Sequence, residues 1–369
     1  MRIRFDVIYT PYEAVHDAVL AVEGGRVVDI ASGPYDVDFR GYIAAPGLID
    51  THTHGCCGID FTSSPHRLGE LASAYLKYGV TAFLPTTVSA PRPVLERAVE
   101  AVRSYAGRGA RVLGIHMEGP YINPARRGAQ NPAHIRRPDP DEVEAYVGSG
   151  VLRVMTLAPE VDGGMDLVRR LSLAGAIPSV GHTDADHATT KRAVALGASR
   201  ATHIFNAMRG FHHREPGAAL ALLESEHVYV EFIADMVHLS PEAVRLVLSL
   251  AGPRRAVAVT DSIAAAGLGD GVYKLGDQEV IVSGGRATLP DGTIAGGAST
   301  LDKIVRSLVE IGVRPETALA VASRTPAESL GMLDLGCLRP GCRADIAVMD
   351  KGFKPVATLV DGQLLWSIT

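Results

Sequence analysis

The central part of the sequence repeats one unit, an apolar run followed by a run with the 3.6-residue periodicity of an amphipathic helix. Eight such units predict eight strands, which we expect to end at His54, Thr87, Glu118, Leu157, His182, His203, His238 and Asp261. The helices between them are expected to begin near Pro65, Pro91, Asp139, Gly163, Asp184, Pro216 and Pro241. Eight strand–helix units over about 290 residues predict an α/β chain with a (β/α)8 TIM-like barrel. A doubly wound open sheet is the alternative, but no Gly-X-Gly-X-X-Gly follows the first strand.

Both ends of the chain differ from the middle, because they are rich in short strands and glycine turns. Such strands are predicted at residues 18–23, 26–30, 344–349, 356–360 and 363–366. We expect the two ends to form one small β-sandwich domain of residues 1–45 and 335–369, beside a barrel of residues 46–334. Short strands inserted after the eighth barrel strand are expected at 272–275, 279–282 and 286–289, and closing helices near 300–311, 315–323 and 325–330.

Most of the predicted strands end in a side chain that can bind a metal or carry a proton. These side chains are His52, His54, Glu118, His182, His203 and Asp261. Enzymes with this barrel work at the carboxyl ends of the strands, so the six are expected to meet. Taken singly, each has a structural alternative, such as a buried partner of an arginine for Glu118 or a helix cap for Asp261. Together, four imidazoles and two carboxylates suit Zn²⁺ or a similar divalent ion.

This set of residues favours metal-assisted hydrolysis. Zn²⁺ lowers the pKa of a bound water and polarises a carbonyl oxygen. Asp261 is expected to take the proton of the water and return it to a leaving amine. The sequence contains no Gly-X-Ser-X-Gly motif, the motif that would indicate catalysis through a covalent intermediate. His116 is expected to support Glu118 from behind, whereas His66, His134, His187 and His227 are predicted to be surface or helix residues.

Charge and hydropathy give no indication of nucleic-acid or membrane partners. The formal net charge is −5, and no apolar run reaches the roughly 18–20 residues that a membrane span needs. The first residues lack the apolar segment of a signal peptide, which favours a cytoplasmic protein. Four cysteines are too few for a disulfide framework, so Cys56 and Cys57 are expected in the core, and Cys337 and Cys342 in structural positions.

Six motifs give the chain a resemblance to a known family. They are Pro-Gly-Leu-Ile-Asp-Thr-His-Thr-His-Gly, His-Met-Glu-Gly-Pro-Tyr, Gly-His-Thr-Asp-Ala, Thr-His-Ile-Phe-Asn-Ala-Met, His-His-Arg-Glu-Pro-Gly and Val-Thr-Asp-Ser. The chain resembles the amidohydrolase superfamily and, within it, the N-acetylglucosamine-6-phosphate deacetylase family, from about residue 46 to residue 330. The resemblance implies deacetylation of a phosphosugar by one or two divalent ions, most simply Zn²⁺, in a homodimer.

The resemblance also implies roles for the metal-binding residues. Glu118, His182 and His203 would hold the main ion. His52 and His54 would hold a second ion, with Glu118 shared between the two. Asp261 would be the catalytic acid and base.

The substrate contacts that the resemblance implies come from several loops. Asn206 and Ala207 would contact the sugar, His238 an acetyl or sugar oxygen, and Arg214 the phosphate across the dimer interface. The pocket wall would be formed by Ile294, Ala295 and Gly296, and by the loop with Ala129 and Gln130.

Gln130 departs from the family, which usually has histidine at this position. Because of this departure, an N-acetyl sugar without phosphate and another phosphosugar are alternative substrates. Another amidohydrolase, acting on a cyclic amide or a dipeptide, and a scaffold without metal are further alternatives.

Overall fold

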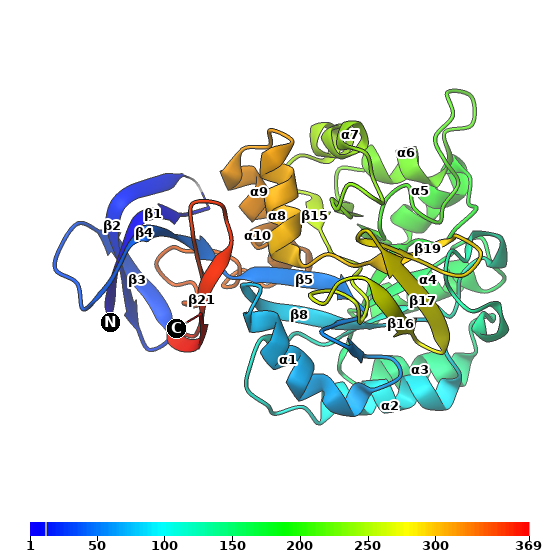
Figure 1. Cartoon of the computed structure of the whole chain (residues 1–369). Coiled ribbons are helices and arrows are strands. Elements are labelled where there is room, and N and C mark those ends of the chain that lie inside the picture. The colour runs from blue at the N-terminus through cyan, green and yellow to red at the C-terminus, as the bar shows by residue number, and fades with distance from the viewer. Residues whose placement is uncertain (12, 369) are drawn as a thin grey trace.

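The computed structural model describes residues 1–11 and 13–368. Eight parallel strands follow one another around a barrel (Figure 1). They are β5 (Leu48–Thr53), β8 (Val80–Thr87), β10 (Ile115–Glu118), β11 (Leu152–Leu157), β12 (Ile177–Val180), β13 (Arg200–Ala201), β14 (Tyr229–Phe232) and β15 (Ala256–Ala258). The barrel closes just past β15, where Thr53 bridges Ser262 and the Asp261 amide donates to the His52 carbonyl at 2.9 Å. The predicted (β/α)8 barrel is therefore confirmed.

Helices cover the outside of the barrel. They are α1 (Leu68–Leu76), α2 (Arg92–Arg103), α3 (Pro140–Gly148), α4 (Gly164–Leu173), α5 (His187–Ala195), α6 (Gly217–Leu223), α7 (Pro241–Ala251), α8 (Leu301–Glu310), α9 (Pro315–Val321) and α10 (Arg324–Ser329). Short 3₁₀ turns lie at Pro65–Arg67, Pro124–Arg126 and Pro132–His134. Most helices begin within a few residues of the predicted positions. α5 begins later than predicted because the Asp186 side chain, rather than Asp184, accepts from the Thr189 amide and caps it.

Four strands end two or more residues earlier than the sequence predicts, and β5 ends one residue before the predicted His54. The predicted ends His182, His203, His238 and Asp261 all lie in loops beyond β12, β13, β14 and β15. At His182, His203 and Asp261 the backbone has a positive φ, which no strand accommodates. His238 lies in a turn in which the Asp235 carboxylate accepts from its amide at 2.8 Å. The predicted strand ends at these four positions are wrong, because each residue belongs to a turn that its own contacts fix.

Both ends of the chain meet in one mixed sheet of seven strands, seen at the left of Figure 1. The strands are β1 (Arg2–Tyr9), β2 (Ala14–Glu23), β3 (Arg26–Ala31), β4 (Val37–Pro46), β20 (Ile346–Met349), β21 (Pro355–Val360) and β22 (Gln363–Ser367). β4 pairs with β1 on one side and with β20 on the other, which joins the two ends of the chain. The predicted terminal β domain is confirmed, while its boundaries at residues 45 and 335 stay a prediction.

A four-stranded antiparallel sheet lies beside the mouth of the barrel. It contains β16 (Gly271–Leu275), β17 (Gln278–Ser283), β18 (Arg286–Thr288) and β19 (Ile294–Gly297). The first three strands were predicted, and β19 was not. Gly296 has φ +71° and a Cβ there would lie 2.8 Å from the Asp261 carbonyl oxygen, so only glycine lets β19 approach this close. The Gly297 amide donates to the same carbonyl at 2.7 Å, which ties the sheet to the Asp261 loop.

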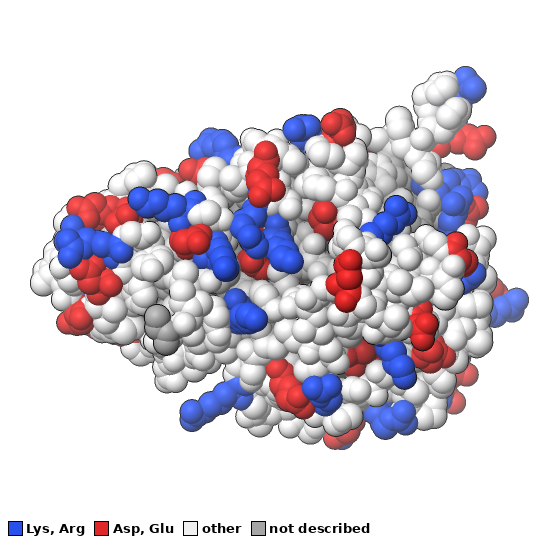
Figure 2. Space-filling view, in the orientation of Figure 1, with Lys and Arg blue, Asp and Glu red and all other residues white. Residues whose placement is uncertain are grey.

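Three further short strands complete the secondary structure. β6 (Gly55–Cys56) and β7 (Ile59–Asp60) form a small hairpin after β5, and β9 (Arg111–Val112) pairs with β8. On the face seen in Figure 2, acidic and basic side chains are interspersed. Within the described residues, no helix combines the length and apolar character that a membrane crossing requires.

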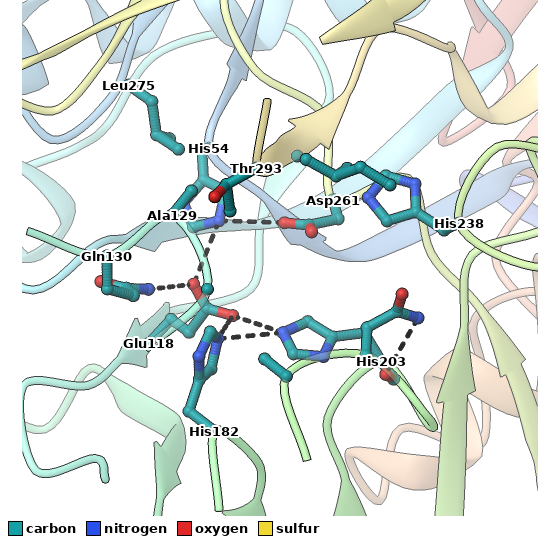
Figure 3. A pocket seen from close by; sticks show the side chains of 15 residues that line it. His54, Glu118, Ala129, Gln130, His182, His203, His238, Asp261, Leu275 and Thr293 are labelled. Carbon is teal, nitrogen blue, oxygen red and sulfur yellow. Dashed lines mark hydrogen bonds and ion pairs between the residues drawn. The ribbon is translucent and has the colours of Figure 1, made fainter. Parts of the chain in front are cut away.

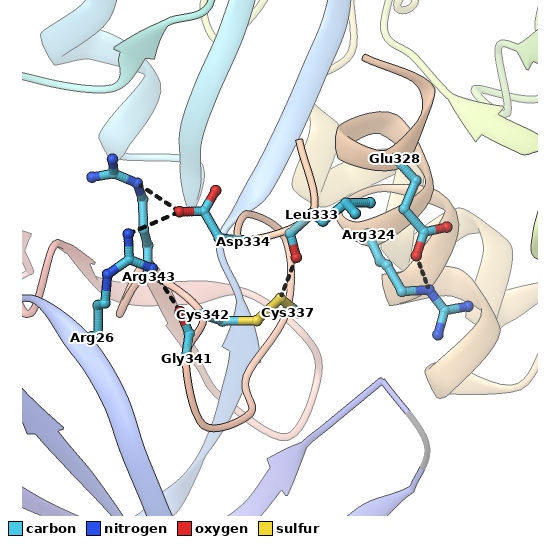
Figure 4. Close-up of a disulfide and its surroundings, with 9 residues drawn as sticks. All are labelled: Arg26, Arg324, Glu328, Leu333, Asp334, Cys337, Gly341, Cys342 and Arg343. Atoms are coloured by element: carbon cyan, nitrogen blue, oxygen red, sulfur yellow. Dashed lines mark hydrogen bonds and ion pairs between the residues drawn. A yellow bond between two sulfur atoms is a disulfide. The ribbon is translucent and has the colours of Figure 1, made fainter. Parts of the chain in front are cut away.

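Cys337 and Cys342 form a disulfide with a Cα–Cα distance of 6.1 Å (Figure 4). Structural positions are predicted for both cysteines from the sequence, whereas their pairing is not. The bond closes the loop that leads from α10 to β20. In the same region Asp334 binds Arg26 at 3.1 Å and Arg343 at 3.4 Å. The crosslink and these ion pairs therefore hold the link between barrel and terminal sheet. Cys56 is buried and free, as expected, whereas Cys57 is free but only half-buried, so its predicted core position is wrong.

Candidate metal centre

The predicted site residues converge on a cavity of about 250 Å³ at the carboxyl ends of the barrel strands (Figure 3). Its wall includes His54, Glu118, Gly128, Ala129, Gln130, His182, His203, Asn206, Ala207, His238, Asp261, Leu275, Thr293, Ile294 and Gly296. His52 lies on β5, fully buried, beneath this wall. Glu118 is the last residue of β10 and lies in the middle of the group.

One group of ligand atoms surrounds the Oε1 atom of Glu118. The Nε2 atom of His182 lies 3.1 Å from this oxygen and the Nε2 atom of His203 lies 2.9 Å from it. The two Nε2 atoms are 3.1 Å apart. Two imidazole nitrogens and a carboxylate oxygen that meet this closely can bind one cation together.

A second group joins His52, His54 and Asp261 to the same glutamate. The Nε2 atom of His54 lies 3.0 Å from Asp261 Oδ1 and 3.4 Å from Glu118 Oε2. The Nε2 atom of His52 lies 3.3 Å from Glu118 Oε1 and 3.3 Å from Asp261 Oδ1. Glu118 therefore contacts both groups, with Oε1 near His182, His203 and His52 and Oε2 near His54, as a bridging ligand would.

The arrangement fits a divalent metal. His52 Nε2 and Asp261 Oδ1 are both buried and have no hydrogen-bond partner within the described residues. Buried polar atoms are normally satisfied, so two such atoms pointing into one group of ligands indicate a missing partner. Nitrogen and oxygen donors in this ratio suit Zn²⁺ and similar borderline ions.

The Nδ1 atoms of three histidines are held from behind. His54 Nδ1 lies 3.2 Å from the Thr86 carbonyl oxygen, and His182 Nδ1 lies 3.0 Å from that of Arg126. His52 Nδ1 lies 2.9 Å from the Glu231 carboxylate. An acceptor at Nδ1 fixes the ring and favours a proton there, so each Nε2 is directed into the centre and can offer its lone pair to an ion that binds.

The charges of the centre stabilise one another. Burial alone would raise the pKa of Glu118, but His182 and His52 hold that pKa well below its usual value. Burial would lower the pKa of His54, but the neighbouring carboxylates of Asp261 and Glu118 raise it to about 9. The carboxylates are therefore ionised at neutral pH. A metal ion that binds must displace protons from the histidines.

Three of the ligand residues have a backbone conformation that is unusual for residues other than glycine. The φ angles are +47° at His182, +26° at His203 and +48° at Asp261. Such angles are costly and persist where the surrounding structure enforces them, often at functional sites. Each of these residues turns away from its strand into the cavity.

His116 does not support Glu118 directly, which corrects the sequence-based expectation. Its Nδ1 atom lies 3.2 Å from the Thr51 carbonyl oxygen and its Nε2 atom 2.8 Å from Thr156 Oγ1. Its ring packs against His52, with the ring centroids 4.5 Å apart. Burial and His52 lower the pKa of His116 to about 3, so this histidine is neutral.

Most of the predicted substrate contacts line the cavity, including Ala129, Gln130, Asn206, Ala207, His238, Ile294 and Gly296. Ala295 is buried behind the wall. Arg214 is exposed on a loop and pairs with His213 at 2.7 Å, away from the cavity of its own chain. Arg214 belongs to the loop between β13 and α6, which projects from the barrel at the upper right of Figure 1.

Gln130 interacts with the metal centre itself. Its Nε2 donates to Glu118 Oε2 at 2.5 Å, and its Oε1 accepts from the Ser89 amide at 2.6 Å. The amide is therefore held at both ends. Gly128, Leu275 and Thr293 also line the cavity and were not predicted. Leu275 ends β16 and Thr293 directly precedes β19 of the inserted sheet, whose position over the barrel no local pattern indicates.

The fold and the centre are those of a metal-dependent amidohydrolase. The sequence profile of the Amidohydrolase family matches residues 43–365, so the chain belongs to this family. It is similar over nearly its whole length to deacetylases of N-acetylated sugar phosphates. It shares 37% identity with the N-acetylglucosamine-6-phosphate deacetylase of Bos taurus, over 95% of this chain and 91% of that protein.

Two further relatives extend this finding. The N-acetylgalactosamine-6-phosphate deacetylase of Escherichia coli O157:H7 is 36% identical, over 94% of each chain. A mutant N-acetyl-D-glucosamine-6-phosphate deacetylase from Mycobacterium smegmatis, solved in complex with N-acetyl-D-glucosamine-6-phosphate, superposes with a TM-score of 0.94. It is 33% identical and covers 100% of this chain and 99% of its own.

Proposed function

We propose that the chain removes the acetyl group from N-acetylglucosamine-6-phosphate, giving glucosamine-6-phosphate and acetate. One observation carries the proposal. Glu118 is shared by two groups of histidines, and Asp261 faces the same cavity, in an amidohydrolase similar over nearly its whole length to sugar-phosphate deacetylases. A linear amide is therefore the bond we expect to be cleaved.

The metal is proposed to be Zn²⁺, as one or two ions per chain. Glu118, His182 and His203 would hold the main ion, and His52 and His54 the second. When bound, such an ion activates water and polarises the amide carbonyl. The histidines contribute neutral Nε2 donors, and Glu118 contributes the negative charge that both positions share.

Asp261 is proposed to carry the proton. Its carboxylate faces the cavity, and burial would raise its pKa, but His52 and His54 keep that pKa below its usual value. Ionised Asp261 can accept a proton from the attacking water. It then returns the proton to the amide nitrogen as the C–N bond breaks and the new C–O bond of acetate is complete.

The sugar is proposed to lie against Asn206, Ala207 and His238, with Ile294, Ala295 and Gly296 forming the far wall. His238 is oriented by Asp235, which lies 2.8 Å from its Nδ1 atom. This leaves the Nε2 atom of His238 for an acetyl or sugar oxygen. Ala129 and Gln130 would complete the wall beside Glu118.

A homodimer is proposed because Arg214 lies outside the cavity of its own chain. A guanidinium binds a phosphate through two parallel hydrogen bonds, and Arg214 stands on a loop that projects from the barrel. Arg214 of one chain would then bind the 6-phosphate held by its partner. A charged sugar phosphate is made inside the cell, so we also propose a cytoplasmic location.

The epimer N-acetylgalactosamine-6-phosphate is a second candidate substrate, because one similar protein is named for it. The two sugars differ at one hydroxyl. Gln130, where the family usually has histidine, makes the unphosphorylated sugar a third substrate to compare.

The test is a comparison of acetate release from four compounds by the purified protein. They are N-acetylglucosamine-6-phosphate, its galactosamine epimer, N-acetylglucosamine, and a cyclic imide. The proposal predicts the highest kcat/KM for the first compound. Highest turnover of the epimer would reassign the substrate, and turnover of the imide alone would refute a sugar deacetylase.

A further inference from the structure

A buried ion pair lies beneath the metal centre, and the proposed reaction uses neither of its members. Glu231 on β14 is 0% exposed and Arg200 on β13 is 1% exposed. The Nε atom of Arg200 donates to Glu231 Oε1 at 2.6 Å. The other oxygen, Oε2, accepts from Nδ1 of His52 at 2.9 Å and lies 3.3 Å from the amide nitrogen of His203.

Arg200 is itself fixed on every side. Its Nη1 atom donates to Ser329 Oγ at 2.7 Å, and its Nη2 atom donates to Thr51 Oγ1. The guanidinium therefore cannot rotate away from Glu231. Removing two charges from water costs more than their attraction commonly returns, so stability alone does not account for this pair.

The partner of His52 differs in kind from those of His54 and His182, while the Nδ1 atom of His203 has no hydrogen-bond partner within the described residues. His54 and His182 each direct Nδ1 to a backbone carbonyl oxygen, which is neutral. His52 alone directs Nδ1 to a carboxylate. A carboxylate at Nδ1 fixes the tautomer and ring orientation and makes the Nε2 atom a stronger donor to a metal.

The surroundings of the His52 Nε2 atom agree with a role as a metal ligand. The Nε2 atom is buried and has no hydrogen-bond partner among the residues described. It is nevertheless 3.3 Å from Glu118 Oε1 and 3.3 Å from Asp261 Oδ1. One ring nitrogen is thus held rigidly while the other is directed at two carboxylates.

We propose that Glu231, clamped by Arg200, is a positioning residue for His52, and that binding of an ion between His52, His54, Glu118 and Asp261 depends on it. The ion at Glu118, His182 and His203 depends on it much less. The inference rests on the metal centre of the proposed function and is independent of which substrate is cleaved.

The test is metal counting on the full chain. Wild-type protein and the Glu231→Gln variant are dialysed against chelator-buffered Zn²⁺, and the bound zinc is measured by mass spectrometry. We expect two ions in the wild type. In the variant the affinity for one ion should fall by about 10- to 100-fold, while the other ion is retained. Unchanged affinity for both ions, or a single ion in the wild type, would overturn the proposal.

A double-mutant cycle distinguishes an effect of Glu231 through His52 from a general disturbance of the metal centre. If Glu231 acts through His52, then Glu231→Gln has no further effect on zinc affinity in a His52→Ala background. An equal loss in both backgrounds would show that Glu231 acts elsewhere, and would overturn the proposal.

Two further variants keep the test decisive. Glu142→Gln also removes a buried carboxylate from an ion pair, with the half-buried Arg136, but neither residue lines the cavity, so both zinc affinities should stay unchanged. If Glu231→Gln does not fold, Glu231→Asp retains a charge for Arg200 but is one methylene too short for His52. It should show the same loss of one ion. Because the readout is bound zinc, a missing deacetylase activity would not be confused with a missing ion.

Discussion

Replacing Asp261 by asparagine is expected to abolish most turnover without unloading the metal centre. The change keeps the size of the side chain and the backbone bond from the Asp261 amide to the His52 carbonyl. It removes the one property that the mechanism needs, the capacity to accept a proton. Asparagine still offers a side-chain oxygen toward His54, whose Nε2 atom lies 3.0 Å from the carboxylate now present.

The size of the loss follows from what else the cavity could use as a base. His238 also lines the cavity, but its Nδ1 atom is bound to Asp235. Burial would lower the pKa of His238, but Asp235 raises it above its usual value, so His238 is protonated more often than a free histidine and is less available to accept a proton. General acid–base catalysis contributes about 10²- to 10⁴-fold. With no substitute base, we expect kcat to fall about 10³-fold, which corresponds to about 4 kcal/mol.

The assay is acetate release under saturating substrate, with zinc content and substrate affinity measured on the same samples. Asp345→Asn is the matched control, because Asp345 is also buried but pairs with Arg111 at the junction with the terminal sheet. The control should keep wild-type kcat. If Asp261→Asn retained kcat within tenfold of the wild type, with its zinc unchanged, the proton-transfer role of Asp261 would be refuted.

Three further predictions concern the phosphate, the second ion and the stability of the fold. Arg214→Ala should raise KM for N-acetylglucosamine-6-phosphate about 10- to 100-fold, the equivalent of one charge-assisted contact, with KM for the unphosphorylated sugar unchanged; equal changes in both would exclude a phosphate contact. The double variant His52→Gln/His54→Asn should lose one of two zinc ions and keep measurable deacetylation; loss of both ions would contradict a main position at Glu118. Burial would raise the pKa of Glu142, but Arg136 lowers it below its usual 4.5. Ionised Glu142 therefore stabilises the folded protein fully above pH 4.5, and this contribution to the free energy of unfolding is lost as the pH falls through the lower folded-state pKa. The urea midpoint of Glu142→Gln should therefore lie below that of the wild type at pH 7 and approach it at pH 3, and a constant gap would refute the linkage.

The barrel could be predicted because its signals are local. Each strand is a short apolar run and each helix has its own periodicity. Small errors in the predicted ends of strands and helices therefore do not change the number or order of the eight units. Glu118 was placed correctly because it is still within its strand. His203 and Asp261 were placed too far along their strands. Their positive φ angles depend on contacts with distant segments, such as the bond from the Gly297 amide to the Asp261 carbonyl, which no local pattern contains.

Glu231 and Arg200 were missed although the sequence carries a signal for one of them. Glu231 interrupts the apolar run Val228-Tyr229-Val230-Glu231-Phe232, where a charge on the buried face of a strand requires a partner. The identity of that partner is a property of the closed barrel. β13 and β14 must pair in register before Arg200 and Glu231 can meet. A sequence can thus indicate that a charge is buried, while the fold determines which charge satisfies it.

Gln130 shows how a single substitution constrains the substrate. Its carbonyl oxygen accepts from the Ser89 amide and one N–H donates to Glu118, so only the remaining N–H is free for a ligand. A neutral donor of this kind can bind an acetyl or sugar oxygen, but it adds no positive charge for a phosphate. The charge that recognises a 6-phosphate must then come from elsewhere, and Arg214 is the predicted contact that can supply it. The Arg214→Ala variant of this protein should therefore lose its preference for the phosphorylated sugar more completely than the same variant of a relative with histidine at the position of Gln130. Adding Gln130→His to the Arg214→Ala variant should restore part of that preference.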